Sequence, residues 1–279
     1  MDDVLVWLDE NIGSGVDDEF DLKCANGLFQ SAIKGEWNEV LKICEKNWLL
    51  QTLITKLGDT VLHLAAYNNL EDIFEQLLKP VPSGSHLATS TLRKKNKIGN
   101  TPLHIAASVG SVRMCHTIIK KTKSTTLLSV RNNDDLTPLF SAALHGHKEA
   151  FIYFHSICTP EEGYKYSKRK DGETILHCAI AEEYFELSIM ILHRYRDLVN
   201  VVNGDGMTPL HILASKPSAF KSGCELRWFE NFIYHCKYTA IFSSFVVYLK
   251  SLILSLFSFA PNYSLFNYQI TKQFEEKNY

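Results

Sequence analysis

The most constraining feature of the sequence is a nine-residue phrase that returns five times. The copies read GDTVLHLAA from Gly58, GNTPLHIAA from Gly99, DLTPLFSAA from Asp135, GETILHCAI from Gly172 and GMTPLHILA from Gly206. Their threonines are separated by 34 to 41 residues, a period typical of stacked helical repeats. A degenerate copy near residue 25 keeps the register without the threonine. The sequence therefore predicts an array of repeats that starts near residues 25, 58, 99, 135, 172 and 206.

Each phrase has the features of a helix start. The threonine is a good N-cap residue, and Pro102, Pro138 and Pro209 follow it at the first helical position, where a missing N–H does no harm. Residues that tolerate a left-handed backbone follow each first helix, and these are Gly35, Asn69, Gly110 and Gly146. The next stretch again has helical periodicity. One repeat is thus predicted as helix, turn, helix and loop.

These motifs resemble the ankyrin-repeat family, whose Thr-Pro-Leu-His-x-Ala signature is matched in full from Thr101 to Ala106. The resemblance covers residues 22–228. It implies an all-α solenoid of five to six stacked helix-turn-helix units. Pro217 stands where the sixth unit should have its mid-repeat glycine, so we expect the final repeat to be incomplete.

Histidines recur at one position of the phrase, as His63, His104, His177 and His211. A metal or acid–base role is one interpretation. The family resemblance implies instead that each forms structural hydrogen bonds in the turn between repeats. No nucleophile elbow, phosphate-binding loop or zinc-protease signature is present. We therefore expect no enzyme activity, no cofactor and no metal site.

Charge is distributed unevenly along the chain. Residues 1–21 form an acidic N-terminal lead, whereas residues 91–170 are basic on balance. The basic segments are predicted to lie between the helix pairs, where they are either solvated loops or a surface for an acidic protein or an anionic membrane. The net charge of −2 gives no reason to expect nucleic acid as a partner.

We expect partners to bind through the inter-repeat loops and through the concave surface formed by the first helices. The candidate contact residues share positions in or near the turns. They are Lys94, Lys95, Lys97, Asn100, Asp134, Asp135, Lys168, Arg169, Lys170 and Glu173.

The C-terminal segment 229–279 is apolar. Residues 240–260 read AIFSSFVVYLKSLILSLFSFA, which is long enough for one membrane span, although Lys250 near its centre opposes insertion. The alternatives are a helix that caps the array and an unstructured tail. If the segment spans a membrane, the upstream basic residues favour repeats on the cytoplasmic side.

The diverged phrases at Gly58 and Gly172 are similar to those of plant ankyrin proteins that carry a C-terminal membrane region with a Pro-Gly-Gly motif, which is missing here. That resemblance implies signalling in defence or stress responses. The seven cysteines contain no CxxC pair and favour a reducing compartment. We expect a protein-interaction scaffold or adaptor in the cytosol, or alternatively a membrane-anchored signalling protein at the cytoplasmic face of the plasma membrane.

Overall fold

In the computed structural model of the chain, residues 18–45 and 50–216 are described, with side chains from residue 24 onward. The chain divides into two compact parts, Met1–Ile175 and Leu176–Tyr279. The described residues of both parts are helical, and the one β-bridge among them joins Lys168 to Thr174. The chain is an all-α repeat solenoid, as the sequence predicted.

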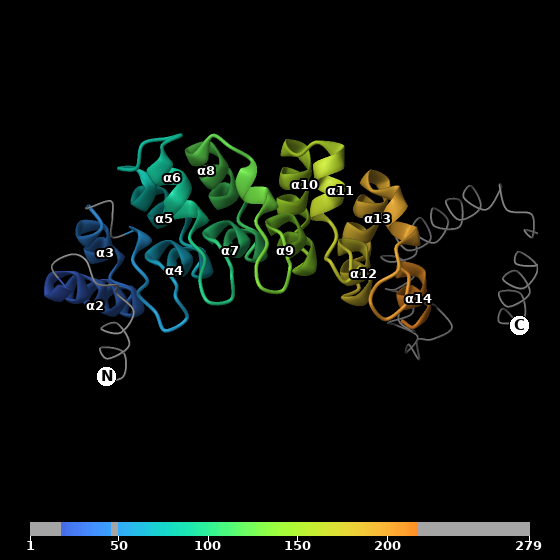
Figure 1. Cartoon of the computed structure of the whole chain (residues 1–279), viewed down its shortest axis with the longest axis horizontal. Coiled ribbons are helices and arrows are strands. Elements are labelled where there is room, and N and C mark those ends of the chain that lie inside the picture. The colour runs from blue at the N-terminus through green and yellow to red at the C-terminus, as the bar shows by residue number, and fades with distance from the viewer. Residues whose placement is uncertain (1–17, 46–49, 217–279) are drawn as a thin grey trace, which may run out of the picture. The chain divides into compact units, whose positions relative to one another are not determined.

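Helix pairs form the part Met1–Ile175. They are α2 (Asp18–Lys34) with α3 (Trp37–Ile43), α4 (Val61–Tyr67) with α5 (Glu71–Leu78), α7 (Pro102–Ser108) with α8 (Val112–Thr122), and α9 (Pro138–Leu144) with α10 (Lys148–Ile157). The first helices α4, α7 and α9 pack side by side in one layer, and α5, α8 and α10 form a second layer (Figure 1). This arrangement is the expected repeat of helix, turn and helix.

The same part contains helices that the sequence analysis placed in loops. They are α6 (His86–Arg93), α11 (Pro160–Tyr166) and the short 3₁₀ helix η2 (Thr126–Ser129). Local caps explain α6 and α11: the Ser85 hydroxyl accepts the Ala88 N–H at 3.0 Å, and Thr159 and Glu162 form a reciprocal capping box. Arg93 and Lys165 therefore lie in helices and not in loops, although both helices lie between helix pairs as predicted.

The part Leu176–Tyr279 continues the repeat pattern. Its described elements are α12 (Ile175–Ala181), α13 (Phe185–Arg194), the 3₁₀ helix η3 (Arg196–Asn200) and α14 (Pro209–Ala214). Helix α12 begins one residue before the boundary between the two parts. Thr208 caps α14, and Pro209 occupies its first position. The fifth phrase therefore starts a helix by the same local chemistry as the earlier ones.

Small residues allow the first helices to approach one another closely. The alanine pairs in α4, α7 and α9 are all fully buried, and they are Ala65 and Ala66, Ala106 and Ala107, and Ala142 and Ala143. Larger side chains fill the space toward the second layer, where Phe74, Phe151 and Phe154 are completely buried. Each repeat thus buries its apolar faces against its neighbours.

The turns inside the repeats have the left-handed backbone that the sequence predicted. Gly35, Asn69, Gly110 and Gly146 all have positive φ, between 53° and 78°. Position 110 also has no room for a side chain, because a Cβ there would lie 2.5 Å from His147 Nδ1. In the fifth repeat the position belongs to Glu183, with φ of 62°, which no residue-type signal indicated.

Several predictions fall on residues that the structure leaves undescribed. Residues 1–17 of the acidic lead and the whole segment 229–279, with its candidate span 240–260, lie outside the described residues. Helix α2 begins at Asp18, inside the range assigned to the lead. Across residues 18–45 and 50–216, no helix combines the length and apolar character that crossing a bilayer requires.

Candidate functional site: the finger loops

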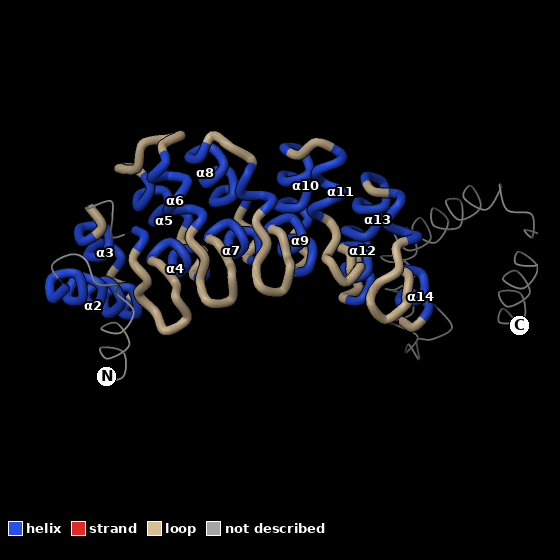
Figure 2. The backbone as a smooth tube through the Cα atoms, in the orientation of Figure 1, coloured by secondary structure: helices blue, strands red, loops and turns tan. Residues whose placement is uncertain are grey.

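Loops between successive repeats project beside the first helices α4, α7 and α9, as Figure 2 shows. We call residues 55–60, 96–101, 132–137 and 168–174 the first to fourth finger loops. Each is closed by one main-chain hydrogen bond of 2.8 to 3.0 Å, donated by Ile54, Asn96, Asn132 and Arg169 to Asp59, Asn100, Leu136 and Glu173, respectively. Each also turns at a left-handed residue, which is Gly58, Gly99, Asp135 or Gly172.

Hydrogen bonds join each finger loop to the next. The Lys97 N–H donates to the Leu57 carbonyl at 2.8 Å, and the Asn133 N–H donates to the Ile98 carbonyl at 3.0 Å. The fourth finger loop binds differently, because its Lys170 N–H donates to the Asp135 carboxylate at 2.7 Å. The four loops therefore form a connected row.

Asparagines fix the shape of the second and third finger loops. The Asn96 side-chain oxygen accepts the N–H groups of Ile98 and Asn100, and its amide donates to Asp59 at 2.8 Å. Asn132 repeats this pattern in the third loop, and its amide donates to the Asn100 side chain at 2.8 Å. Asn100, a predicted contact residue, is thus also a link between neighbouring loops.

The recurrent histidines His63, His104 and His177 tie the first helices that contain them to the loop before the first helix of the next repeat. His104 Nδ1 accepts the Thr101 N–H at 3.2 Å, and its Nε2 lies 3.0 Å from the Leu136 carbonyl. Because a carbonyl only accepts, Nε2 must carry the proton. His63 makes the same contacts with Thr60 and the Asn100 carbonyl. In the second part His177 Nε2 lies 3.1 Å from the Met207 carbonyl.

Burial keeps His63 and His104 neutral. Desolvation lowers the pKa of His104 to about 4, and it lowers the pKa of His63 in the same way. Both ring nitrogens of each are already engaged. The geometry therefore gives them a structural role, as the family resemblance implied. Among the residues that the structure describes, no group of three or more His, Cys, Asp or Glu could hold a metal ion.

The fourth repeat replaces this histidine by Phe140, which is fully buried. With no imidazole to contact, the Thr137 hydroxyl donates to the Tyr166 carbonyl at 2.7 Å and accepts the Phe140 N–H at 3.1 Å. The Thr137 hydroxyl therefore joins this helix start to the last residue of α11, just before the fourth finger loop. No motif in the sequence indicated this contact.

Asp135 occupies the position that glycine holds in the other finger loops, with φ of 62°. Its carboxylate accepts from Arg131 at 3.1 Å and from the Lys170 N–H at 2.7 Å. Only 18% of its side chain is exposed. This predicted contact residue therefore holds the third and fourth finger loops together and presents little surface to a partner.

The remaining predicted contact residues differ in how much they contact the chain itself. Lys95 donates to the Arg131 carbonyl, Lys168 lies over the Tyr164 ring, and Arg169 pairs with Asp171. The Glu173 N–H donates to Asp171, and its carbonyl closes the fourth loop. Lys97, Asp134 and Lys170 are exposed, and Lys94 is partly exposed beside the second loop.

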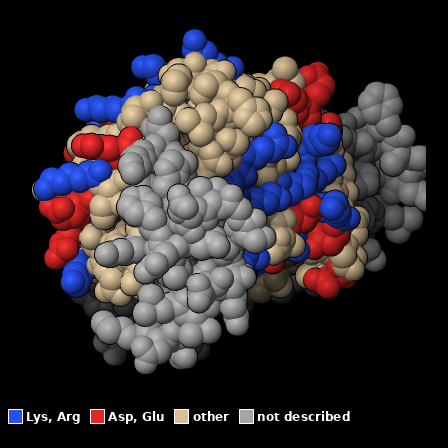
Figure 3. Space-filling model, turned by 60° about the vertical axis from the view of Figure 1, so that its left-hand side comes forward, with Lys and Arg blue, Asp and Glu red and all other residues tan. Residues whose placement is uncertain are grey.

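The basic segment does not form one continuous surface of loops. Lys120 and Lys121 lie in the last turn of α8, and the Lys121 carbonyl accepts the Gly84 N–H at 2.7 Å. This contact joins α8 to the loop before α6 and not to a finger loop. Figure 3 shows Lys and Arg side chains gathered on one face of the molecule with Asp and Glu beside them. The charge is therefore mixed at short range.

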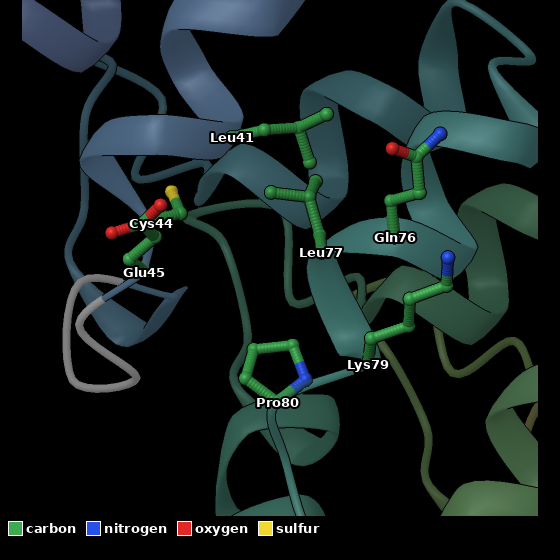
Figure 4. A pocket seen from close by; sticks show the side chains of 7 residues that line it. All are labelled: Leu41, Cys44, Glu45, Gln76, Leu77, Lys79 and Pro80. Atoms are coloured by element: carbon green, nitrogen blue, oxygen red, sulfur yellow. The ribbon is translucent and has the colours of Figure 1, made fainter.

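A pocket of about 500 Å³ lies at the ends of the outer helices α3 and α5 (Figure 4). Its lining is mainly apolar and includes Leu41, Cys44, Leu77 and Pro80, with Glu45, Gln76 and Lys79 at the edge. Burial raises the pKa of the Cys44 thiol to about 12, so this thiol is not a nucleophile at neutral pH. Its lining residue Glu45 directly precedes residues 46–49 in the sequence, which are not described, and we assign the pocket no ligand.

Comparison with known proteins agrees with this geometry. The family model for ankyrin repeats (3 copies) matches residues 8–126 and 62–157, which together make up more than half of the chain. Four helix pairs, the first three finger loops and the contacts of His63 and His104 lie in the matched region. The chain belongs to the ankyrin-repeat family.

Individual relatives share only part of their length with this chain. It is 25% identical over 160 residues to the nuclear factor NF-kappa-B p105 subunit of Gallus gallus, covering 57% of this chain and 15% of that protein. For the Mus musculus p105 subunit the values are 27% over 227 residues, 70% and 23%. A probable 26S proteasome regulatory subunit p28 of Saccharomyces cerevisiae is 32% identical over 99 residues, 36% of this chain and 39% of that protein. The chain thus spans less than half the length of each of these relatives.

Proposed function

We propose that this chain is a non-enzymatic protein-interaction scaffold or adaptor that holds its partner along the row of finger loops. One observation carries the proposal: main-chain bonds fix neighbouring loops against one another while their tip side chains, such as Ile98 and Asp134, remain exposed. A preformed surface loses little conformational entropy on binding. The similarity of the chain to a subunit of a nuclear factor and to a proteasome regulatory subunit supports a role in a protein assembly.

The partner we propose has an acidic contact surface. Lys56, Lys94, Lys97 and Lys165 are exposed or partly exposed in or beside the finger loops, and clustered cations speed and orient the approach of an acidic partner. An anionic membrane surface is a second ligand for the same charges. We place the scaffold in signalling, including defence or stress responses, and in the cytosol.

Proximity labelling with the full chain tests this function. A variant with Lys94→Glu and Lys165→Glu reverses charge beside the finger loops, and a matched control with Lys120→Glu and Lys123→Glu makes the same change at the end of α8. We expect the finger variant to lose a set of neighbours that the control retains. Identical neighbours for both variants would show that the finger charges do not select the partner.

The alternative function is a membrane-anchored signalling protein with its repeats at the cytoplasmic face of the plasma membrane. The sequence of residues 240–260 favours it, because these 21 residues are mostly apolar and long enough for one span. The resemblance to plant ankyrin proteins with a membrane region has no support in the comparisons above. Carbonate extraction of membranes from cells that express the full chain decides the point: an anchored chain stays in the pellet, whereas an adaptor is released.

A further inference from the structure

The tips of the four finger loops fall into two chemically different pairs. Directly before each left-handed residue stands an exposed pair of side chains: Lys56 and Leu57, Lys97 and Ile98, Asn133 and Asp134, and Lys170 and Asp171. The first two tips therefore each present a lysine and a large apolar side chain. The last two end in aspartate. Leu57 is 56% exposed and Ile98 is 40% exposed.

The two apolar tips are held next to each other. The Lys97 N–H donates to the Leu57 carbonyl at 2.8 Å, and the helices that follow these loops, α4 and α7, pack directly together. Packed helices lie about 8–10 Å apart, which sets the separation of the two tips. The exposed leucine and isoleucine therefore lie one repeat apart, and each has a lysine beside it. Together they form a surface that fits an apolar segment flanked by acidic residues.

The chain itself contains such a segment. Residues 2–10 read DDVLVWLDE, five apolar residues with two acidic residues on each side. Even fully extended, Val4 to Leu8 covers about 13 Å, enough for both tips. From the adjacent apolar tips and the lysines beside them, we infer that residues 2–10 bind intramolecularly to Leu57 and Ile98. The acidic residues of this segment then face Lys56 and Lys97.

The connection is long enough for this contact. Residues 9–17 separate Leu8 from the first residue of α2, Asp18, and such a stretch reaches up to about 33–36 Å when extended. Helix α2 packs on α4, which directly follows the first finger loop. Because both surfaces belong to one chain, the effective concentration of the segment is high, on the order of millimolar. A weak contact is then enough to keep the two apolar tips covered.

Photo-crosslinking of the purified full chain tests the inference without any partner. With p-benzoylphenylalanine in place of Trp7, we expect crosslinks within one chain to residues 56–58 and 97–99, mapped by mass spectrometry. Leu57→Ser with Ile98→Ser should lower their yield by roughly fivefold, because two apolar contacts are lost. Asp134→Ser changes the equivalent tip of the third finger loop and should leave the yield unchanged.

Charge is tested separately. Lys56→Glu with Lys97→Glu should lower the same yield, and raising the salt concentration should lower it in the unmodified chain, because salt screens exposed charges. Crosslinks that map elsewhere, that form only between chains, or that ignore the serine variants would overturn the inference. That outcome would leave the proposed scaffold function intact. The scaffold is tested separately, by the cellular proteins that are labelled near the variant with Lys94→Glu and Lys165→Glu.

Discussion

At the scale of single residues, the recurrent histidine shows how one side chain serves two layers of the structure. His104 caps its own helix through Thr101 and holds the next finger loop through the Leu136 carbonyl. Both contacts require the neutral ring, because Nδ1 must accept while Nε2 donates. A side chain that invites a catalytic interpretation is therefore fully occupied by main-chain hydrogen bonds.

This arrangement predicts that acid weakens the fold. The folded-state pKa of His104 is about 4, against an ordinary value of 6.5, so the unfolded chain binds more protons between these values. The contribution of His104 is complete above about pH 6.5 and is lost as pH falls toward 4, up to about 3 kcal/mol. Urea unfolding at pH 7 and pH 5 measures the loss.

Replacement by the residue found in the fourth repeat isolates this contribution. His104→Phe should destabilise the fold by about 1–3 kcal/mol at pH 7, because the Leu136 carbonyl and the Thr101 N–H lose their partner. The gap between variant and parent should narrow at pH 5. His86→Gln, at an exposed position of α6, serves as the control. A gap that stays constant with pH would contradict the assignment.

At the scale of elements, the second finger loop leaves no room for a side chain at its left-handed residue. Gly99 has φ of 82°, and a Cβ there would lie 2.5 Å from the Asn133 side-chain oxygen and 2.7 Å from its backbone nitrogen. Gly35 has a similar φ of 74° but no atom within 4 Å of its Cβ position. Backbone conformation and packing can therefore be separated with two glycines.

Alanine at each position makes that separation measurable. Gly35→Ala should cost about 1–2 kcal/mol, the penalty of a left-handed backbone alone. Gly99→Ala should cost clearly more, because the second and third finger loops must also move apart. Thermal or urea unfolding of the two variants gives the comparison. Equal losses would mean that the contact between these loops adds nothing to stability.

Much of this element could be predicted from sequence, and the reasons for the misses are specific. Thr101 with Pro102, and Gly110 after them, are local signals, and the structure bears them out. The start of helix α11 can also be predicted from the sequence, because Thr159 and Glu162 have capping-box spacing. The bond from Thr137 to the Tyr166 carbonyl was not, since it joins residues 29 apart whose meeting depends on the packed repeats.

At the scale of the whole molecule, stability depends on which repeats have neighbours on both sides. Within the part Met1–Ile175, α7 packs against α4, α8 and α9, whereas the short outer helix α3 packs mainly against α2 and α5. Repeat arrays gain stability mainly from contacts between neighbours. Within each part of the chain, we accordingly expect the helices to differ in how readily they open.

Hydrogen exchange should resolve this gradient. The amides of α7 should exchange roughly tenfold or more slowly than those of α3, because opening α7 breaks two interfaces between repeats. Mass spectrometry of peptic fragments under native conditions provides the measurement. Uniform exchange across both helices would indicate a single cooperative unit in place of a graded array.

The main-chain bonds between finger tips have a consequence for how such a protein can diversify. Lys97 to Leu57 and Asn133 to Ile98 are joined through N–H and carbonyl groups that nearly every amino acid possesses. The side chains at these positions can therefore be exchanged by mutation without dismantling the row. Recognition and architecture are inherited through different atoms, so new specificities can arise at the tips while the scaffold stays intact.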